Sequence, residues 1–363
     1  MTRLIMAAGG GGDAVAAVML DAVLHGGQDR AVILTYAWDR LIIDPVPGPR
    51  GPDNFTGLHQ LTPHVCTVPD YAHPIAPAGS TLPRLAAELP HTFALIDPRH
   101  GAQGMTRQLE ELIAELSPET IDVLDVGGDI LARGDEPTLK SPLGDALTLA
   151  ACAQVDADIR LLIAGPGLDG EIPVEDLRDR LGPRIHTLTA EQVEPISSVL
   201  EWHPSEATAM LAATARGVRG LCEVRDAGLP VALTDDGPTV HEADLDEALQ
   251  HNELARRLLP TTSLEEAEHH SREVCGYSEI DHERNKALWL TDQAPKELDP
   301  DAALRQLTAF EAQARSRGIT HTTFRHLTEA LGYKGTQRET LRTLLTTTHP
   351  EQYTAPLWHL GDA

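Results

Sequence analysis

The chain has 363 residues, of which 4% are aromatic, and it carries a formal net charge of −26 at pH 7. Binding to nucleic acid or to an anionic membrane needs clustered lysine and arginine, and base stacking needs aromatic rings, so this composition argues against both classes of partner. No apolar run approaches the ~20 residues that span a bilayer, and Met1 leads into an apolar segment without the basic start of a signal peptide, so we expect a cytoplasmic protein.

Two buried strands are expected in the first forty residues. Residues 3–8 (RLIMAA) form a short apolar run that ends in four glycines, and residues 14–24 repeat apolar side chains at helical spacing. This pattern predicts a strand, a loop and a helix. A second apolar run at 31–35 precedes a proline- and glycine-rich stretch at 44–57, and loops of that length are usually functional or disordered.

Three further apolar runs, at 92–96, 121–126 and 160–164, alternate with helical patterns at 105–116 and 143–155. This alternation predicts an α/β fold with a doubly wound, mostly parallel sheet of the Rossmann type. In such open sheets the ligand crevice lies beyond the carboxyl ends of the strands, so we expect the loops at that edge to converge. The loops in question are Gly9–Asp13, Gly127–Asp129 and Gly165–Gly170.

The next elements are expected to be a capped helix and a hairpin. Ser205 is a suitable N-cap for a helix over 206–216, and Gly217 is a suitable residue to end it. The apolar runs at 229–234 and 239–240 flank an Asp-Asp-Gly turn, which predicts a β-hairpin.

Beyond Asp244 the pattern becomes helical and charged, most clearly at 304–317 and 324–331. We therefore expect two parts, a Rossmann-like domain with a ligand crevice and a mainly helical C-terminal region. Their predicted limits are 1–245 and 246–363.

The glycine-rich loop is the first candidate for ligand binding. Gly9, Gly10, Gly11 and Gly12 lie between the first expected strand and its helix and formally match G-x-G-x-x-A, so their amides are placed to bind a phosphate. Asp13 would lie beside that phosphate, which requires a cation between the two charges. The alternative is a tight turn in which Asp13 only caps the helix and stabilises it by ~1 kcal/mol.

The proline-rich loop after the second strand carries Arg40, Asp44 and Arg50. Arginine in a rigid loop suits the recognition of phosphate or carboxylate. The alternative is a salt bridge from Asp44 to either arginine that only braces the loop.

A third group of candidates follows the fourth expected strand, which ends in Gly127, Gly128 and Asp129. Glu136 and Asp145 come soon after. We assign catalytic roles to Asp129, Glu136 and Asp145, because carboxylates this close in sequence can share acid–base work. Asp129 and Asp145 are also predicted to bind Mg²⁺ or Mn²⁺.

Further polar residues are expected at the same edge of the sheet. Ser141 opens the helix that contains Asp145, while Asp169 and Glu171 follow the strand at 160–164. They are candidate ligand contacts. The alternative is that Ser141 caps the helix, Asp145 favours the helix dipole and the turn at Asp169 is an ordinary one.

Several of these segments together resemble the family called domain of unknown function 1152 (DUF1152), over most of residues 1–290. The resemblance implies a Rossmann-like α/β fold and no particular activity. The Gly-Gly-Asp loop is also similar to those of phosphofructokinase-like and of lipid or NAD kinases, although Ile130 stands where those have glycine. The segments that carry the DUF1152 resemblance are 7–17 (AAGGGGDAVAA), 36–50 (YAWDRLIIDPVPGPR), 125–146 (DVGGDILARGDEPTLKSPLGDA), 164–172 (AGPGLDGEI), 202–220 (WHPSEATAMLAATARGVRG) and 282–287 (HERNKA).

Three functions are compatible with these residues. The first is an enzyme that binds a phosphorylated or nucleotide-like small molecule, with a divalent cation assisting phosphoryl transfer or hydrolysis and Arg40 and Arg50 neutralising the substrate. The second is an NAD(P)-dependent oxidoreductase with Asp39 on the ribose, and the third is a non-catalytic ligand-binding sensor or scaffold. A serine hydrolase is not expected, because Ser205, near His203, lacks the G-x-S-x-G elbow. A homo-oligomer is compatible with all three.

Overall fold

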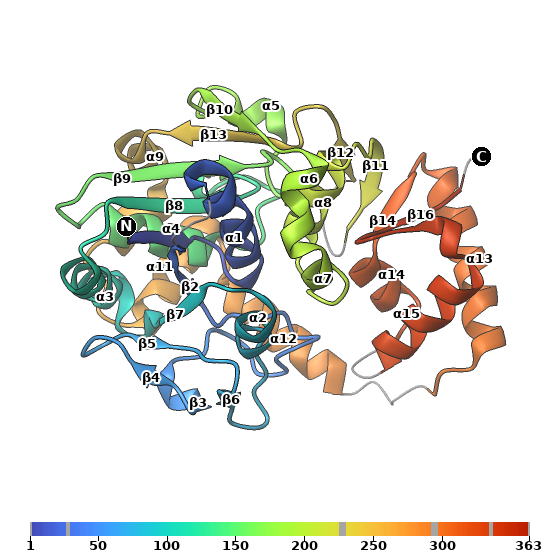
Figure 1. Ribbon diagram of the computed structural model, residues 1–363, viewed down its shortest axis with the longest axis horizontal. Helices are drawn as coiled ribbons and strands as arrows, with labels where there is room; N and C mark the ends of the chain where they lie inside the picture. The colour runs from blue at the N-terminus through green and yellow to red at the C-terminus, as the bar shows by residue number, and fades with distance from the viewer. Residues whose placement is uncertain (1, 27–29, 225–229, 292–296, 334–336, 362–363) are drawn as a thin grey trace.

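The computed structural model divides the chain into a large α/β body and a smaller C-terminal body, which lie side by side in Figure 1. Among the described residues, no helix combines the length and the apolar character needed to cross a membrane. The structure describes residues 2–26, 30–224, 230–291, 297–333 and 337–361.

Five parallel strands form the centre of the larger sheet, in the order β9-β8-β1-β2-β7. The chain runs outward from β1 to β2 and β7, then crosses over to β8 and β9 on the other side. This arrangement confirms the predicted doubly wound, Rossmann-like sheet, and it places a topological switch point between β1 and β8. The strands are β1 (Arg3–Ala7), β2 (Val32–Tyr36), β7 (Thr92–Ile96), β8 (Thr120–Val126) and β9 (Ile159–Ala164).

Antiparallel strands extend this sheet at both edges to nine strands in the described part of the chain. One edge adds β5 (Cys66–Thr67) and β4 (His59–Gln60), and the other adds β13 (Thr239–Ala243) and β10 (Arg184–Thr187). The proline-rich stretch after β2 is mostly irregular, apart from the 3-10 turn Pro52–Asn54 and the first strand of a separate short pair. That pair joins β3 (Phe55–Thr56) to β6 (His73–Pro74).

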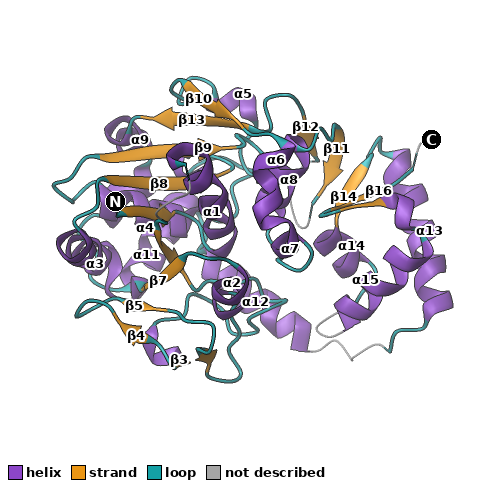
Figure 2. Ribbon diagram, in the orientation of Figure 1, coloured by secondary structure: helices purple, strands orange, loops and turns teal. Residues whose placement is uncertain are grey.

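Helices cover both faces of the sheet (Figure 2). Alternate strand residues point to opposite faces, so Ile5 packs with Val15 of α1 in one apolar core, whereas Leu4 packs with Leu109 of α3 and Leu147 of α4 in the other. The helices of the larger body are α1 (Gly11–His25), α2 (Leu82–Glu88), α3 (Gly101–Leu116), α4 (Pro142–Cys152), α5 (Val174–Leu177), α6 (Ala190–Val193), α7 (Ser197–Leu200), α8 (Glu206–Ala215), α9 (Leu245–His251), α10 (Glu253–Leu258), α11 (Leu264–Cys275) and α12 (Glu279–Thr291).

The expected caps of α8 are confirmed. The Ser205 side chain accepts a hydrogen bond from the Thr208 amide at the start of the helix. Gly217, just beyond its end, has a φ of 89°, which glycine adopts most easily.

The expected β-hairpin around Gly237 is wrong. Strand β12 (Val231–Leu233) pairs with β11 (Gly220–Glu223) in a second sheet, whereas β13 pairs with β9 and β10 in the first. An Asp-Gly hairpin turn needs a positive φ at its glycine, and Gly237 does not adopt one. Leu229, where the expected hairpin begins, lies outside the described residues.

The C-terminal body has its own apolar core, which includes Leu307, Phe324 and Trp358. It is mainly helical, as expected, but its strands join β11 and β12 in a five-stranded sheet of order β12-β11-β14-β16-β15. Leu254 and Ile280 lie beyond the predicted boundary at residue 245, but they pack in an apolar core of the larger body. The position of the boundary therefore stays a prediction. The elements are α13 (Pro300–Ser316), β14 (His321–Thr323), α14 (Phe324–Ala330), α15 (Gln337–Thr348), β15 (Tyr353–Thr354) and β16 (Leu357–His359).

Candidate functional site

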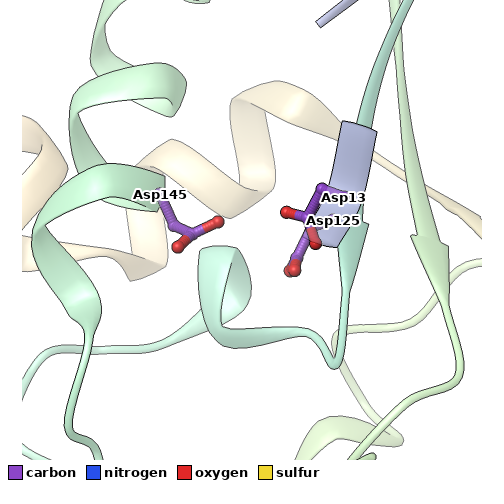
Figure 3. Close-up of side chains that lie close together, drawn as sticks. All are labelled: Asp13, Asp125 and Asp145. Atoms are coloured by element: carbon purple, nitrogen blue, oxygen red, sulfur yellow. The ribbon is translucent and has the colours of Figure 1, made fainter. Parts of the chain in front are cut away.

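Three buried carboxylates meet at the switch point of the sheet. Asp13 lies in the first turn of α1, Asp125 near the end of β8, and Asp145 in the first turn of α4, and Figure 3 shows Asp145 facing the other two. One oxygen from each lies within 4.8 Å of the others. The side chains of Asp125 and Asp145 are almost wholly buried. The predicted convergence of separate loops at this edge is therefore confirmed.

Each of the three carboxylates is held in a different way. Asp13 Oδ2 accepts a hydrogen bond of 2.7 Å from the Gly9 amide, and Asp125 Oδ2 accepts one of 3.1 Å from the Ile130 amide. Asp145 Oδ1 is buried without a hydrogen-bond partner among the described residues. A buried charged oxygen without a partner is costly, so helix capping does not account for Asp145.

Two more carboxylates, those of Asp129 and Asp169, lie beside the three central aspartates. Asp129 lies beside Asp125, and burial next to neighbouring carboxylates raises the pKa of both groups. Asp169 Oδ1 accepts a hydrogen bond from the Glu171 amide, while its Oδ2 is buried and has no partner in the part of the chain that the structure describes. A Cβ atom on Gly127, whose φ is 125°, would lie 2.3 Å from that Oδ2, so only glycine fits there.

Burial and mutual repulsion raise the pKa values of these carboxyl groups. Burial raises the pKa of Asp13 to about 7, and burial together with the charge of Glu171 raises that of Asp169 to about 8. The pKa values of Asp125, Asp129 and Asp145 lie well above the usual range because each is buried beside other carboxylates. At neutral pH the group must therefore hold protons or a cation.

The donor set of the three central aspartates fits a hard divalent cation. All the donors are oxygens, which Mg²⁺, Mn²⁺ and Ca²⁺ prefer over softer ligands. Ligands on opposite sides of an ion are about 4 Å apart for Mg²⁺ and about 5 Å apart for Ca²⁺. The 4.8 Å spread of the oxygens of Asp13, Asp125 and Asp145 is thus compatible with one shared ion.

The four glycines before Asp13 have separate structural roles. Gly10, the N-cap of α1, has a φ of 137°, and a Cβ on Gly12 would lie 2.2 Å from Ser205 Oγ, where α1 packs against α8. Backbone conformation and packing account for these two. Gly9 is exposed, and its Cβ would lie 3.0 Å from Asp145 Oδ2, so a bulkier residue would crowd the carboxylates.

A family model for a protein of unknown function (DUF1152) matches residues 4–287. The chain belongs to the DUF1152 family. The matched range contains all five carboxylates and ends before the C-terminal body. No curated protein and no solved structure gives a significant match.

Sequence reasoning did not assign a ligand role to His203 of this DUF1152 protein. Its Nδ1 accepts a hydrogen bond of 3.3 Å from the Ser205 amide, so Nε2 carries the hydrogen of the neutral ring. Nε2 is buried, has no hydrogen-bond partner among the residues that the structure describes, and lies 3.5 Å from the position of a Cβ on Gly11. Burial lowers the pKa of His203 to about 3, so the imidazole is a neutral N–H donor beside the glycine loop.

Arg40, a predicted ligand contact, carries a charge that acts on the carboxylates, and its role in ligand binding stays a prediction. Its side chain is exposed, and its charge lowers the pKa of Asp13. Partial loss of hydration lowers the pKa of Arg40, but the charges of Glu279 and Glu171 outweigh that effect and raise it. A cationic group therefore stands beside the carboxylates, at a position that solvent reaches.

The proline-rich loop of the DUF1152 protein is braced by an ion pair, which was the alternative interpretation. Arg50 Nε lies 3.0 Å from Asp44 Oδ2, and the Asp44 side chain is fully buried. Arg50 Nη2 also donates to the Val46 carbonyl at 2.9 Å. Both side chains are occupied within the loop, so their roles as ligand contacts stay predictions.

Glu136 and Glu171 likewise have protein partners. Glu136 accepts hydrogen bonds from the Arg133 amide at 2.8 Å and from Arg180 Nη1 at 3.1 Å. Glu171 accepts hydrogen bonds from the amide and the hydroxyl of Ser141, so Ser141 ties two loops together and its hydroxyl does not cap α4. The structure thus brings Asp129 and Asp145 together, whereas Glu136 contacts Arg133 and Arg180 instead. The catalytic roles of all three stay predictions.

Gly128 contributes to the shape of the DUF1152 site through its backbone. Its φ is 107°, and a Cβ there would lie 2.9 Å from Leu177 Cδ1. That backbone conformation strongly favours glycine. The glycine therefore sets the path of the loop that leads from β8 to Asp129.

Proposed function

We propose that the protein is a divalent-cation-dependent enzyme that acts on a phosphorylated or nucleotide-like small molecule by phosphoryl transfer or hydrolysis. The observation that carries this proposal is the unpartnered, buried Oδ1 of Asp145, which faces Asp13 and Asp125 at the switch point. Ligands of open α/β sheets bind at this position. Three converging carboxylates are the ligands expected for a cation that acts with a phosphate.

The chemistry follows from the positions of the side chains. Asp13, Asp125 and Asp145 would hold the cation, which would neutralise phosphate charge and activate a bound oxygen. Gly11 and Gly12 begin α1, where the first amides have no acceptor within the helix and favour an anion. This arrangement also explains how a phosphate can bind next to Asp13, because the cation separates the two negative groups.

The remaining buried carboxyl groups supply proton transfer. Burial raises the pKa of Asp169 to about 8, so it can accept or release a proton near neutral pH. Burial and neighbouring carboxylates raise the pKa of Asp129 as well, which favours its protonated form. A general base or acid works best when its pKa lies close to the operating pH. We propose that one of the two exchanges the proton of the attacking or leaving oxygen.

The structure does not favour the NAD(P)-dependent alternative. An acid that binds the ribose needs both carboxylate oxygens available to the sugar hydroxyls. In this fold Asp39 is buried, and it accepts hydrogen bonds from the Thr81 amide at 3.0 Å and from the Thr81 hydroxyl at 2.7 Å. Asp39 therefore orders the start of α2.

Thermal denaturation with a panel of nucleotides and sugar phosphates tests the proposal. We expect Mg²⁺ or Mn²⁺ alone to raise the melting temperature, and one phosphorylated compound to raise it further. A ligand at 100 times its Kd adds about 2.7 kcal/mol to the stability. Phosphate release from that compound would then identify the reaction. A melting temperature that no combination of cation and phosphorylated compound changes would rule the proposal out.

A further inference from the structure

The C-terminal body directs two buried arginines toward the loop that contains His203. Arg325 lies on α14 and Arg338 on α15, with exposed fractions of 6% and 7%. The charges of both lower the pKa of His203. Arg338 Nη2 donates a hydrogen bond of 2.8 Å to the carbonyl of Trp202, the residue before His203.

Arg338 differs from Arg325 in its partners. Arg325 lies 3.7 Å from Glu206 and 3.4 Å from Glu329. Within the described residues, Arg338 has the Trp202 carbonyl as its hydrogen-bond partner and no carboxylate at ion-pair distance. A buried arginine is normally paired with an anion, because an uncompensated charge is costly to remove from water.

Besides the Trp202 carbonyl, the larger body places hydrogen-bond donors around His203, and the nearby Asp39 carboxylate is already bonded to Thr81. His203 Nε2 is buried without a partner beside Gly11, and Gly11 and Gly12 provide the first amides of the fifteen-residue helix α1. A guanidinium, an imidazole N–H and helix N-terminal amides together match the oxygens of a phosphate. A carboxylate has fewer oxygens than a phosphate and would leave some of these donors without an acceptor.

We propose that Arg338 and His203, together with the amides of Gly11 and Gly12, bind a phosphate group of the substrate, so that the C-terminal body completes the binding site. The inference rests on the proposed function and deepens it, since it assigns a substrate-binding role to a residue outside the range that matches the family model. It also implies that the phosphate binds on the side of the glycine loop that faces His203.

A purely structural role for Arg338 makes a different prediction. Other contacts also join the two bodies, including Arg342 Nη1 to Glu201 at 3.3 Å and Arg216 Nη1 to the Ala355 carbonyl at 2.6 Å. Arg342 lies one helical turn after Arg338 on α15 and contacts the same segment of the larger body. It is therefore a matched control.

Isothermal titration of the full-length protein with pyrophosphate in the presence of Mg²⁺ tests the inference. We expect Arg338→Met to weaken pyrophosphate binding at least tenfold and Arg338→Lys to weaken it less, because lysine keeps the charge but not the planar fork. His203→Ala should also weaken it. Arg342→Met should leave the Kd within about twofold of the wild-type value.

The outcomes separate this inference from the proposed function. If the wild type binds pyrophosphate and the Arg338 variants bind it equally well, the inference is overturned while the proposed function stands. If the wild type binds neither pyrophosphate nor inorganic phosphate, the inference is overturned, and the panel of nucleotides and sugar phosphates decides the proposed function separately. Should Arg338→Met not fold, Arg338→Lys decides the question, since its charge preserves the contact with the Trp202 carbonyl.

Discussion

Replacing Asp145 with asparagine is expected to raise the melting temperature of the metal-free protein and to abolish its response to Mg²⁺ or Mn²⁺. The carboxylate is buried beside Asp13 and Asp125, and its Oδ1 has no protein partner. Removing its charge relieves repulsion, and each unit of raised pKa corresponds to about 1.4 kcal/mol. The same change removes a cation ligand, so the gain of about 2.7 kcal/mol that a cation gives at 100 times its Kd should disappear.

Thermal denaturation in chelator and in 5–10 mM cation, on the order of a hundred times a sub-millimolar Kd, measures both effects. Asp235→Asn is the control, because the Asp235 side chain is 96% exposed in a surface pair with Arg219. The control should respond to the cation like the wild type. A cation response that survives in Asp145→Asn would show that Asp145 is not a ligand.

The metal-free protein is expected to lose stability as the pH rises from 7 to 8.5. In the folded state Asp13 has a pKa of about 7, and Asp169 and Glu279 have pKa values of about 8, all raised by burial. The unfolded chain has already released these protons near pH 4, so the folded state binds more protons in this window. Stability then falls as the pH rises, by about 1.4 kcal/mol per pH unit for each group that is still protonated.

Urea denaturation in chelator at pH 7, 7.75 and 8.5 measures this slope. The buried histidines do not contribute in this window. Burial lowers the pKa of His203 to about 3 and that of His321 to about 4, and these shifts change stability only below the unfolded pKa of 6.5. Saturating Mg²⁺ should flatten the slope, since the cation replaces the protons. Metal-free protein that becomes more stable between pH 7 and 8.5 would contradict the electrostatic account of the site.

The central sheet could be predicted because buried parallel strands appear as uninterrupted apolar runs, as at β1, β8 and β9. The two-residue strands β4 and β5 carry no such signal. The partners of β13 could not be predicted either, because its pairing with β9 depends on residues far apart in the chain. The local Asp-Gly pattern predicts a hairpin, but β12 pairs with β11 and β13 pairs with β9 instead.

The convergence of the site residues could be predicted from topology alone, since β1 and β8 end at the same edge. Asp13 and Asp145 were therefore among the predicted residues, whereas Asp125 was treated as part of a strand. A carboxylate inside a buried apolar run is the signal that could have identified it. His203 and Arg338 could not be assigned, because their positions depend on how α8 packs against α1 and on how the C-terminal body packs against α8.

Anomalous X-ray diffraction from crystals soaked in Mn²⁺ tests the central claim most directly. The account predicts one strong peak at the switch point, coordinated by an oxygen from each of Asp13, Asp125 and Asp145. The absence of a peak there under saturating Mn²⁺, with the three carboxyl groups hydrogen-bonded to one another, would contradict it.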